Sequence, residues 1–269
     1  MASLSRPLAV ALLVGTALLG AGAVLHPMLP ADVSGQLRMI AASSIFRPVH
    51  LAMLCGSGLI IAGVWTRLSL GRATTPAPLI GGLALVCLGL CFNAIDIAFM
   101  GGAGWHLAML CGSGLIIAGV WTRLFLGEPV TPTPLIGALV LVCAGLCFNA
   151  IDIAFMGGAG WHLAMAYVAG QSEMAPLFEA LHRFGLLAAR FGNFLVALGA
   201  LLLGFAERAD PASPRWMAWL AWIAAAGGLA GVVLVPEASL LMLTAVTLIA
   251  GWSVGTSVLA LRGDAGMRG

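Results

Sequence analysis

Residues 50–105 read HLAMLCGSGLIIAGVWTRLSLGRATTPAPLIGGLALVCLGLCFNAIDIAFMGGAGW, and residues 106–161 repeat this stretch with substitutions at only eight positions. A third copy begins at His162 and diverges from the pattern at Ala166. Self-similarity at a fixed period indicates that one structural unit was duplicated in tandem. Each unit contains two apolar runs separated by a turn with Pro and Thr, which predicts a hairpin of two membrane-spanning helices.

The composition predicts that the whole chain lies in a membrane. Hydrophobic residues make up 61% of the 269 residues and charged residues only 8%, a balance far from that of soluble globular proteins. Lipid supplies no hydrogen-bond partners for the backbone, so every span is predicted to be helical. The segments that are apolar and long enough to span a bilayer are 7–25, 49–70, 78–100, 105–126, 134–156, 184–205, 216–235 and 238–261.

The predicted fold is an all-α integral membrane protein, a polytopic bundle of about eight transmembrane helices. It corresponds to a six-helix parent with one duplicated helical hairpin, and it forms a single membrane-embedded domain over residues 1–269. The repeat units 50–105 and 106–161 are followed by an outer-surface segment at 162–185 and a C-terminal three-helix part at 186–269. A short helix is also expected on the outer surface within 31–48, where apolar residues recur at helical spacing.

The arginines predict the orientation of the bundle. All twelve basic residues are arginines, and most of them fall on the side of the amino terminus, which places both termini in the cytoplasm under the positive-inside rule. We expect a multi-pass protein of a bacterial plasma membrane, with the lipid bilayer as its partner and a homo-oligomer or another membrane protein as further candidates. The net charge of +2 gives no reason to expect nucleic acid. The first span also has features of a cleavable secretory signal, and that alternative stays open.

Ionisable residues within spans are costly, so they are the best pointers to a functional site. Asn93 and Asp96 recur as Asn149 and Asp152, and their spacing of three places each pair on one helical face that should point into the bundle. A second polar stripe runs from an outer-surface helix into the span at 184–205. Together they form a candidate polar cluster of Asn93, Asp96, Asn149, Asp152, Glu179, His182, Arg183, Arg190 and Asn193.

The depths of the two stripes predict a buried pair between Arg190 and either Asp96 or Asp152, because a partner at the same depth offsets the cost of a buried charge. The second aspartate would then pair with His106 or His162, which follow a predicted Gly-rich turn, or stay protonated. The six cysteines all lie in the repeat units, where they are predicted to behave as small apolar residues, and no metal site is expected.

Three functions are compatible with these residues. The first is a non-enzymatic structural or accessory role, in which polar groups hold membrane helices together. The second is a transporter of a small polar or anionic solute that uses the Arg, Asp and Asn cluster near the outer face. The third is a haem-binding membrane redox protein with His50, His106, His162 and His182 as candidate ligands.

The haem alternative also has a local resemblance behind it. Glu179-Ala180-Leu181-His182-Arg183 resembles the Glu-x-x-His-Arg element of haem A synthases, in which the histidine ligates haem. The resemblance covers five residues, and the glycine-rich loop that follows the first span in that family is absent. No cofactor is therefore predicted, and haem is kept as the alternative.

Overall fold

The computed structural model describes residues 2–63, 134–211, 213–234 and 243–266, and in these residues the chain is helical, with no strand. Five of the described helical segments are long and apolar enough to cross a membrane: Pro7–Leu25, Phe46–Gly63, Gly137–Val168, Met174–Ala209 and Arg215–Leu234. The predicted all-α, multi-pass class is therefore confirmed. The predicted spans 78–100 and 105–126 lie outside the described residues, so the count of eight and the duplicated hairpin stay predictions.

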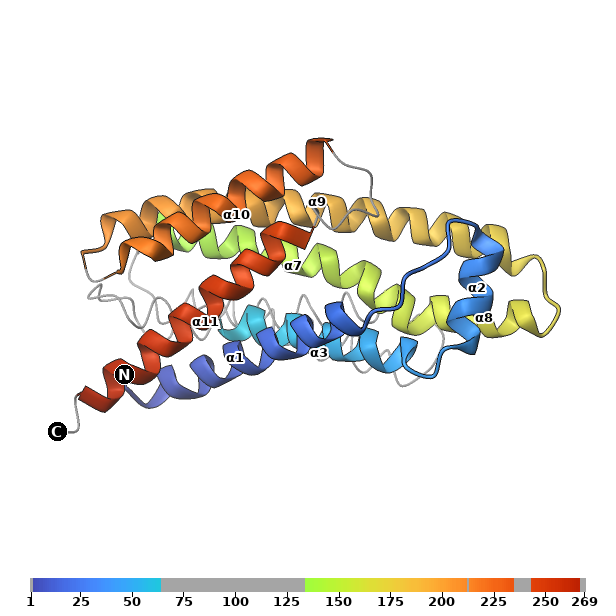
Figure 1. Cartoon of the computed structure of the whole chain (residues 1–269), viewed down its shortest axis with the longest axis horizontal. Coiled ribbons are helices and arrows are strands. Elements are labelled where there is room, and N and C mark those ends of the chain that lie inside the picture. The colour runs from blue at the N-terminus through green and yellow to red at the C-terminus, as the bar shows by residue number, and fades with distance from the viewer. Residues whose placement is uncertain (1, 64–133, 212, 235–242, 267–269) are drawn as a thin grey trace, which may run out of the picture.

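Figure 1 shows the arrangement of these helices. Most run along the long axis of the molecule, whereas the short helix α2 stands across one end of the bundle, which we call the α2 end. Helix α1 begins and helix α11 ends at the opposite end. The elements are α1 (Ala2–Leu25), α2 (Val33–Ala42), α3 (Phe46–Gly63), α7 (Pro134–Phe155), the π-helix η1 (Met156–Gly160), α8 (Trp161–Val168), α9 (Met174–Ala209), α10 (Arg215–Leu234) and α11 (Leu243–Gly266).

Helix α2 confirms the short helix expected within 31–48. The Asp32 side chain caps it by accepting a hydrogen bond from the backbone N–H of Gly35 at 2.6 Å, which satisfies one of the free donors of the first turn. Its buried residues Leu37 and Ile40 are three apart, and they pack with Phe46 and Phe178 in a cluster at the α2 end. An amphipathic helix that lies across a bundle in this way suits a membrane interface.

Close packing between α7 and α9 depends on glycines. A Cβ atom added at Gly192 would lie 2.5 Å from the carbonyl oxygen of Gly145, and one added at Gly199 would lie 2.8 Å from the carbonyl oxygen of Ala138. Small residues allow membrane helices to approach until their backbones touch. The two helices are therefore fixed at a separation that a side chain at either glycine would increase.

The end of the second repeat unit differs from the prediction. The turn expected at Gly157–Trp161 is wrong, because α7 continues through η1 into α8 as one helical segment. Gly157 and Gly158 are buried, and an added Cβ at Gly157 would lie 2.8 Å from Cβ of His50. Packing against α3 thus stabilises helical backbone where glycine by itself favours a turn.

The region 162–185 forms α8, a turn, and the first part of α9. The expected surface helix and the span at 184–205 are parts of one helix of 36 residues, which is about 54 Å long. This length exceeds the hydrocarbon thickness of about 30 Å. Its only proline, Pro176, lies in the first turn, where proline is tolerated.

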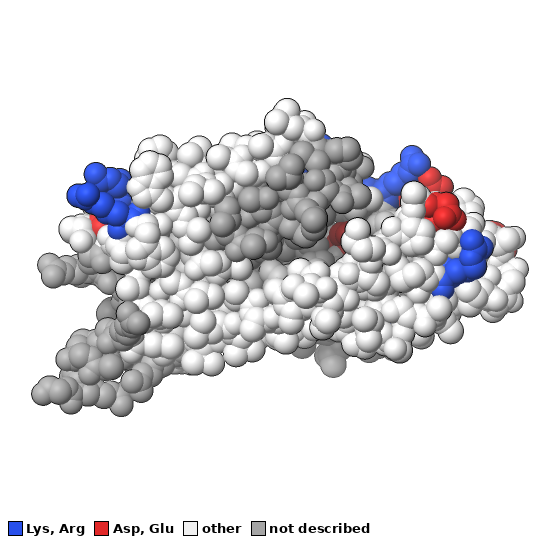
Figure 2. All heavy atoms as spheres, viewed as in Figure 1, with Lys and Arg blue, Asp and Glu red and all other residues white. Residues whose placement is uncertain are grey.

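Charged side chains gather at the two ends of the bundle. Figure 2 shows that most Arg, Asp and Glu atoms of the described residues on one face lie toward the two ends, and that much of the described surface between them is uncharged. Large apolar side chains are exposed on this length, including Phe184, Leu187, Trp219 and Ile223. A wide uncharged belt with exposed apolar residues is expected where a protein faces lipid.

Candidate functional site

The polar residues of α7 and α9 meet in the interior of the bundle. Asn149 donates from Nδ2 to the carbonyl oxygen of Gly145 at 3.0 Å and to Oδ1 of Asn193 at 3.3 Å. Asn193 is only 5% exposed. This side chain pair links the two helices beside the contact between Gly145 and Gly192. We call Asn149, Asp152 and Asn193 the polar seam.

Asp152 lies one turn from Asn149 toward the α2 end. Its Oδ1 atom is buried and has no hydrogen-bond partner. The carboxyl group packs against Gly185 of α9 so closely that a Cβ atom at this glycine would collide with Oδ1. Helix α7 gives way to the π-helix η1 four residues later, and π-helical turns within α-helices occur frequently at functional sites.

Three histidines lie at the α2 end of the polar seam. The Nε2 atoms of His26 and His50 are 3.2 Å apart, and their ring centroids are 4.9 Å apart. The ring of His182 stacks on Phe155 and contacts Phe178 at centroid distances of 6.5 Å and 5.3 Å. Both phenylalanines belong to the same buried cluster as Phe46, whose ring contacts His26 and His50. We call His26, His50 and His182 the histidine cluster. It joins three segments that are far apart in the chain.

The hydrogen bonds of His50 define its tautomer when the ring is neutral. Nδ1 lies 2.8 Å from the carbonyl oxygen of Phe46, and because a carbonyl can only accept, this nitrogen carries the hydrogen. Nε2 of a neutral His50 then has a lone pair, so His26 supplies the hydrogen that joins the two Nε2 atoms. Burial is the larger influence on the pKa of His26 and lowers it, whereas the carbonyl oxygen of Pro27 favours the protonated ring and raises it. The His26 ring is therefore held neutral over a wider pH range than in water.

Arg190 of α9 contacts the end of α10. Its Nε and Nη2 atoms donate to the carbonyl oxygen of Val232 at 3.0 Å and 2.6 Å. This carbonyl lies in the last turn of α10, where helical carbonyls lack partners within the helix. Among the described residues no ion pair joins Arg190 to Asp152, and the buried Oδ1 of Asp152 has no hydrogen bond. Asp96, the other predicted partner, lies outside the described residues.

The remaining predicted residues divide between the surface and the undescribed region. Glu179 and Arg183 form an ion pair at 2.5 Å on the surface of α9, with side chains 41% and 75% exposed, and pairs of this kind contribute little. His162 is exposed and contacts the ring of Trp161. Asn93 and His106 lie outside the described residues. The structure thus brings Asn149, Asp152, His182 and Asn193 to one interface.

The histidine geometry bears on the haem alternative. A metal ion bound between two opposite nitrogen ligands needs about 4 Å between them, from two bonds of about 2.0 Å. The 3.2 Å between His26 and His50 is shorter than this, so haem would require these rings to separate. Among the described residues, no group of three or more His, Cys, Asp or Glu side chains is placed to hold a metal ion.

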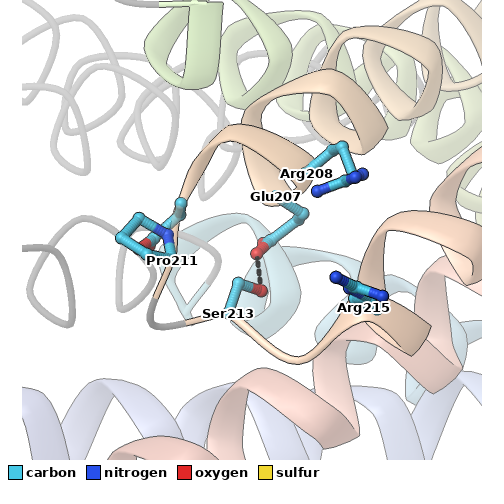
Figure 3. Close-up of a pocket in the computed structure, with 6 residues that line it drawn as sticks. Glu207, Arg208, Pro211, Ser213 and Arg215 are labelled. Atoms are coloured by element: carbon cyan, nitrogen blue, oxygen red, sulfur yellow. Dashed lines mark hydrogen bonds between the residues drawn. The ribbon is translucent and has the colours of Figure 1, made fainter.

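A second buried acid lies at the end of the bundle opposite α2. Glu207 is 1% exposed, and it accepts hydrogen bonds from Trp252 Nε1 at 3.1 Å and from the hydroxyl of Ser213. Figure 3 shows Glu207 and Ser213 in contact, with Arg208 and Arg215 on the same side of a pocket of about 180 Å³. The carboxylate joins α9 to α11 and to the loop before α10. Because its buried bonds are made, we interpret Glu207 as a structural link.

The sequence did not identify two of these side chains, those of His26 and Glu207. His26 directly follows the first apolar span, and Glu207 lies near the end of a span next to Arg208. A residue at a span boundary is usually interfacial, so neither position suggested burial. The available signal was that His26 and His50 flank the same predicted end of consecutive spans.

No known protein family, curated protein or solved structure matches the chain.

Proposed function

We propose that this chain is a proton-coupled transport protein that moves a small polar or anionic solute across a bacterial plasma membrane. Asp152 is proposed to bind and release the proton. The observation that carries this proposal is the buried, unpartnered Oδ1 of Asp152 between α7 and α9. A carboxylate that served only to hold helices together would be expected to have its hydrogen bonds satisfied.

The cost of charge in this place supports proton binding. A charged aspartate at the centre of a membrane helix costs about 2.5–3.5 kcal/mol on insertion scales. Protonation removes this cost and supplies a hydroxyl donor. Acidic and histidine side chains in series are the groups that proton pumps and transporters use as relays. Here the histidine cluster lies between Asp152 and the α2 end. We place the α2 end on the outer side of the membrane and both termini in the cytoplasm.

The π-helix supports movement at the same place. Its five residues include Gly157, Gly158 and Gly160, which resist backbone rearrangement less than other residues. A shift between π-helical and α-helical turns rotates the side chains that precede it relative to those that follow. Asp152 would thereby turn relative to Trp161 and the rest of α8. A solute-dependent rotation of this kind would couple proton binding to solute movement.

Proton movement into liposomes tests the proposal. The purified protein would be reconstituted with a pH-sensitive dye inside, and inorganic phosphate, sulfate, lactate and glycine would be added outside in turn. We expect one of these classes to change the internal pH, and we expect Asp152→Asn to reduce that rate at least about tenfold. Glu173→Gln is the matched control, because Glu173 is an exposed acid at the start of α9. If none of the four compounds changes the internal pH more than it does in empty liposomes, the proposal is contradicted.

A structural or accessory role is the second candidate. The hydrogen bond between Asn149 and Asn193 and the glycine contacts of α7 and α9 favour it, because each is a device that holds membrane helices together. On this account Asp152→Asn changes only the stability of the protein. Equal proton movement in the wild type and in Asp152→Asn, together with a changed unfolding temperature, would support the structural role.

A further inference from the structure

We propose that the groove between α2, α3 and α8 binds the phosphate headgroup of an anionic membrane lipid, with Arg47 as its principal contact. The groove is about 370 Å³ in volume and is lined at its polar side by Ser43, Ser44 and Arg47, and at its apolar side by Pro48, Trp161 and Met165. It is separate from the polar seam. The proposal does not depend on transport.

Arg47 is held at the groove without a counter-charge. Its Cζ atom lies 5.0 Å from the centroid of the Trp161 ring, a cation–π contact that positions the guanidinium. In the described part of the chain no acidic side chain forms an ion pair with Arg47, and its buried Nε has no hydrogen-bond partner. A buried N–H without a partner is costly. A phosphate in the groove that accepted hydrogen bonds from the guanidinium would neutralise its charge.

The surroundings of Arg47 supply the other donors that a phosphate needs. Ser43 and Ser44 contribute hydroxyl groups in the connection between α2 and α3. Helix α3 begins at Phe46, so the positive end of its dipole lies beside the same connection. Of its first turn, Phe46 and Arg47 carry N–H groups without a partner in the helix, whereas Pro48 has none and Val49 donates to Ile45. The hydroxyls, the N–H groups and the guanidinium favour an anion with several acceptor oxygens over a carboxylate with two.

The apolar side of the groove favours a lipid over a free ion. Met165 lines it, and Ile45 and Val168, which lie close by in the chain, are exposed at 49% and 50%. Acyl chains would cover these side chains, whereas a soluble phosphate would leave them bare. Helix α2 stands across the bundle as an interfacial helix does (Figure 1). Arginine beside tryptophan at this level matches the headgroup region of a bilayer.

Native mass spectrometry of the full-length protein in detergent tests the site. Phosphatidylglycerol, phosphatidylcholine and inorganic phosphate would be added separately, and bound copies counted. We expect the wild type to retain phosphatidylglycerol at least about tenfold better than Arg47→Gln, from the loss of hydrogen bonds to a charged group. Arg38→Gln is the matched control, because Arg38 is an exposed arginine of α2 at the same end, and its retention should equal that of the wild type.

The other outcomes overturn the proposal. Equal losses in Arg47→Gln and Arg38→Gln would show that general charge attracts the lipid. Equal retention of phosphatidylglycerol and phosphatidylcholine by the wild type would exclude recognition of an anionic headgroup. Binding of inorganic phosphate without retention of lipid would identify a site for a free anion. The comparison of the three ligands uses only the wild type, so it remains decisive if Arg47→Gln does not fold.

Discussion

Replacement of Gly192 by alanine should weaken the packing of α7 on α9. An alanine Cβ would lie 2.5 Å from the carbonyl oxygen of Gly145 and 3.0 Å from the backbone nitrogen of Asn149. Ordinary contact begins at 3.4 Å, so the helices would have to separate by up to about 0.9 Å. Both contacts are to backbone atoms, so no side chain rotation relieves them.

The expected loss in the free energy of unfolding is about 1–3 kcal/mol. Overpacking of a close interface costs about 1–3 kcal/mol. Separation of the helices would also lengthen the bond between Asn149 and Asn193, which is already 3.3 Å long, and hydrogen bonds between membrane helices are worth about 0.6 kcal/mol on average. The higher helix propensity of alanine offsets at most about 1 kcal/mol of this.

Gly137→Ala is the matched control for this prediction. Gly137 lies on α7, and nothing lies within 4 Å of an added Cβ. The free energy of unfolding of this variant should therefore equal that of the wild type or exceed it by at most about 1 kcal/mol. The assay is equilibrium unfolding in mixed detergent micelles, followed by tryptophan fluorescence. A difference between the two variants below about 0.5 kcal/mol would refute the account of the α7 and α9 interface.

Three further substitutions test other contacts. Trp252→Phe removes the donor to buried Glu207 and should cost about 1–3 kcal/mol, measured by the same unfolding assay. Arg190→Lys loses the two-nitrogen contact to the carbonyl of Val232 and should cost about 1–2 kcal/mol. Burial lowers the pKa of His26 below its ordinary value of 6.5, so the folded protein binds fewer protons than the unfolded chain. Wild-type stability should therefore fall as pH drops below about 6.5, and His26→Gln should reduce the slope.

Each of these predictions has a matched control. Trp219 is exposed, so Trp219→Phe should leave stability unchanged, and an equal loss in both tryptophan variants would contradict the role of Glu207. Arg183 lies on the surface of α9, and Arg183→Lys should be neutral. His162 is exposed, so His162→Gln should keep the wild-type slope with pH. If His26→Gln leaves the dependence of stability on pH unchanged, the pKa of this ring does not differ between the folded and unfolded states.

Periodicity and hydrophobicity predict most of the described helices. The first span ends at Leu25 as expected, and α2 forms where apolar residues recur at helical spacing. Asn149 and Asp152 were predicted to face the bundle, and the bond to Asn193 and the contact with Gly185 place them there. These predictions succeed because lipid requires helical backbone and makes an exposed polar side chain costly.

Contacts between distant segments could not be predicted in the same way. Arg190 donates to a backbone carbonyl of α10, and because every residue offers such a carbonyl, the sequence does not indicate this contact. The contact between His26 and His50 depends on how α1 and α3 are packed and connected. The Gly-rich run at 157–160 predicts a turn locally, but its contact with His50 keeps it helical. In each case tertiary packing overrides the local signal.

Titration of Asp152 itself tests the central claim most directly. Infrared difference spectra of the protein in lipid vesicles would be recorded across pH for the wild type, Asp152→Asn and Glu173→Gln, and the band of protonated carboxyl groups compared. The account predicts that this band contains a component that Asp152→Asn removes and Glu173→Gln leaves in place. Identical spectra for the wild type and Asp152→Asn at every pH would mean that Asp152 binds no proton, and proton coupling through this residue would be contradicted.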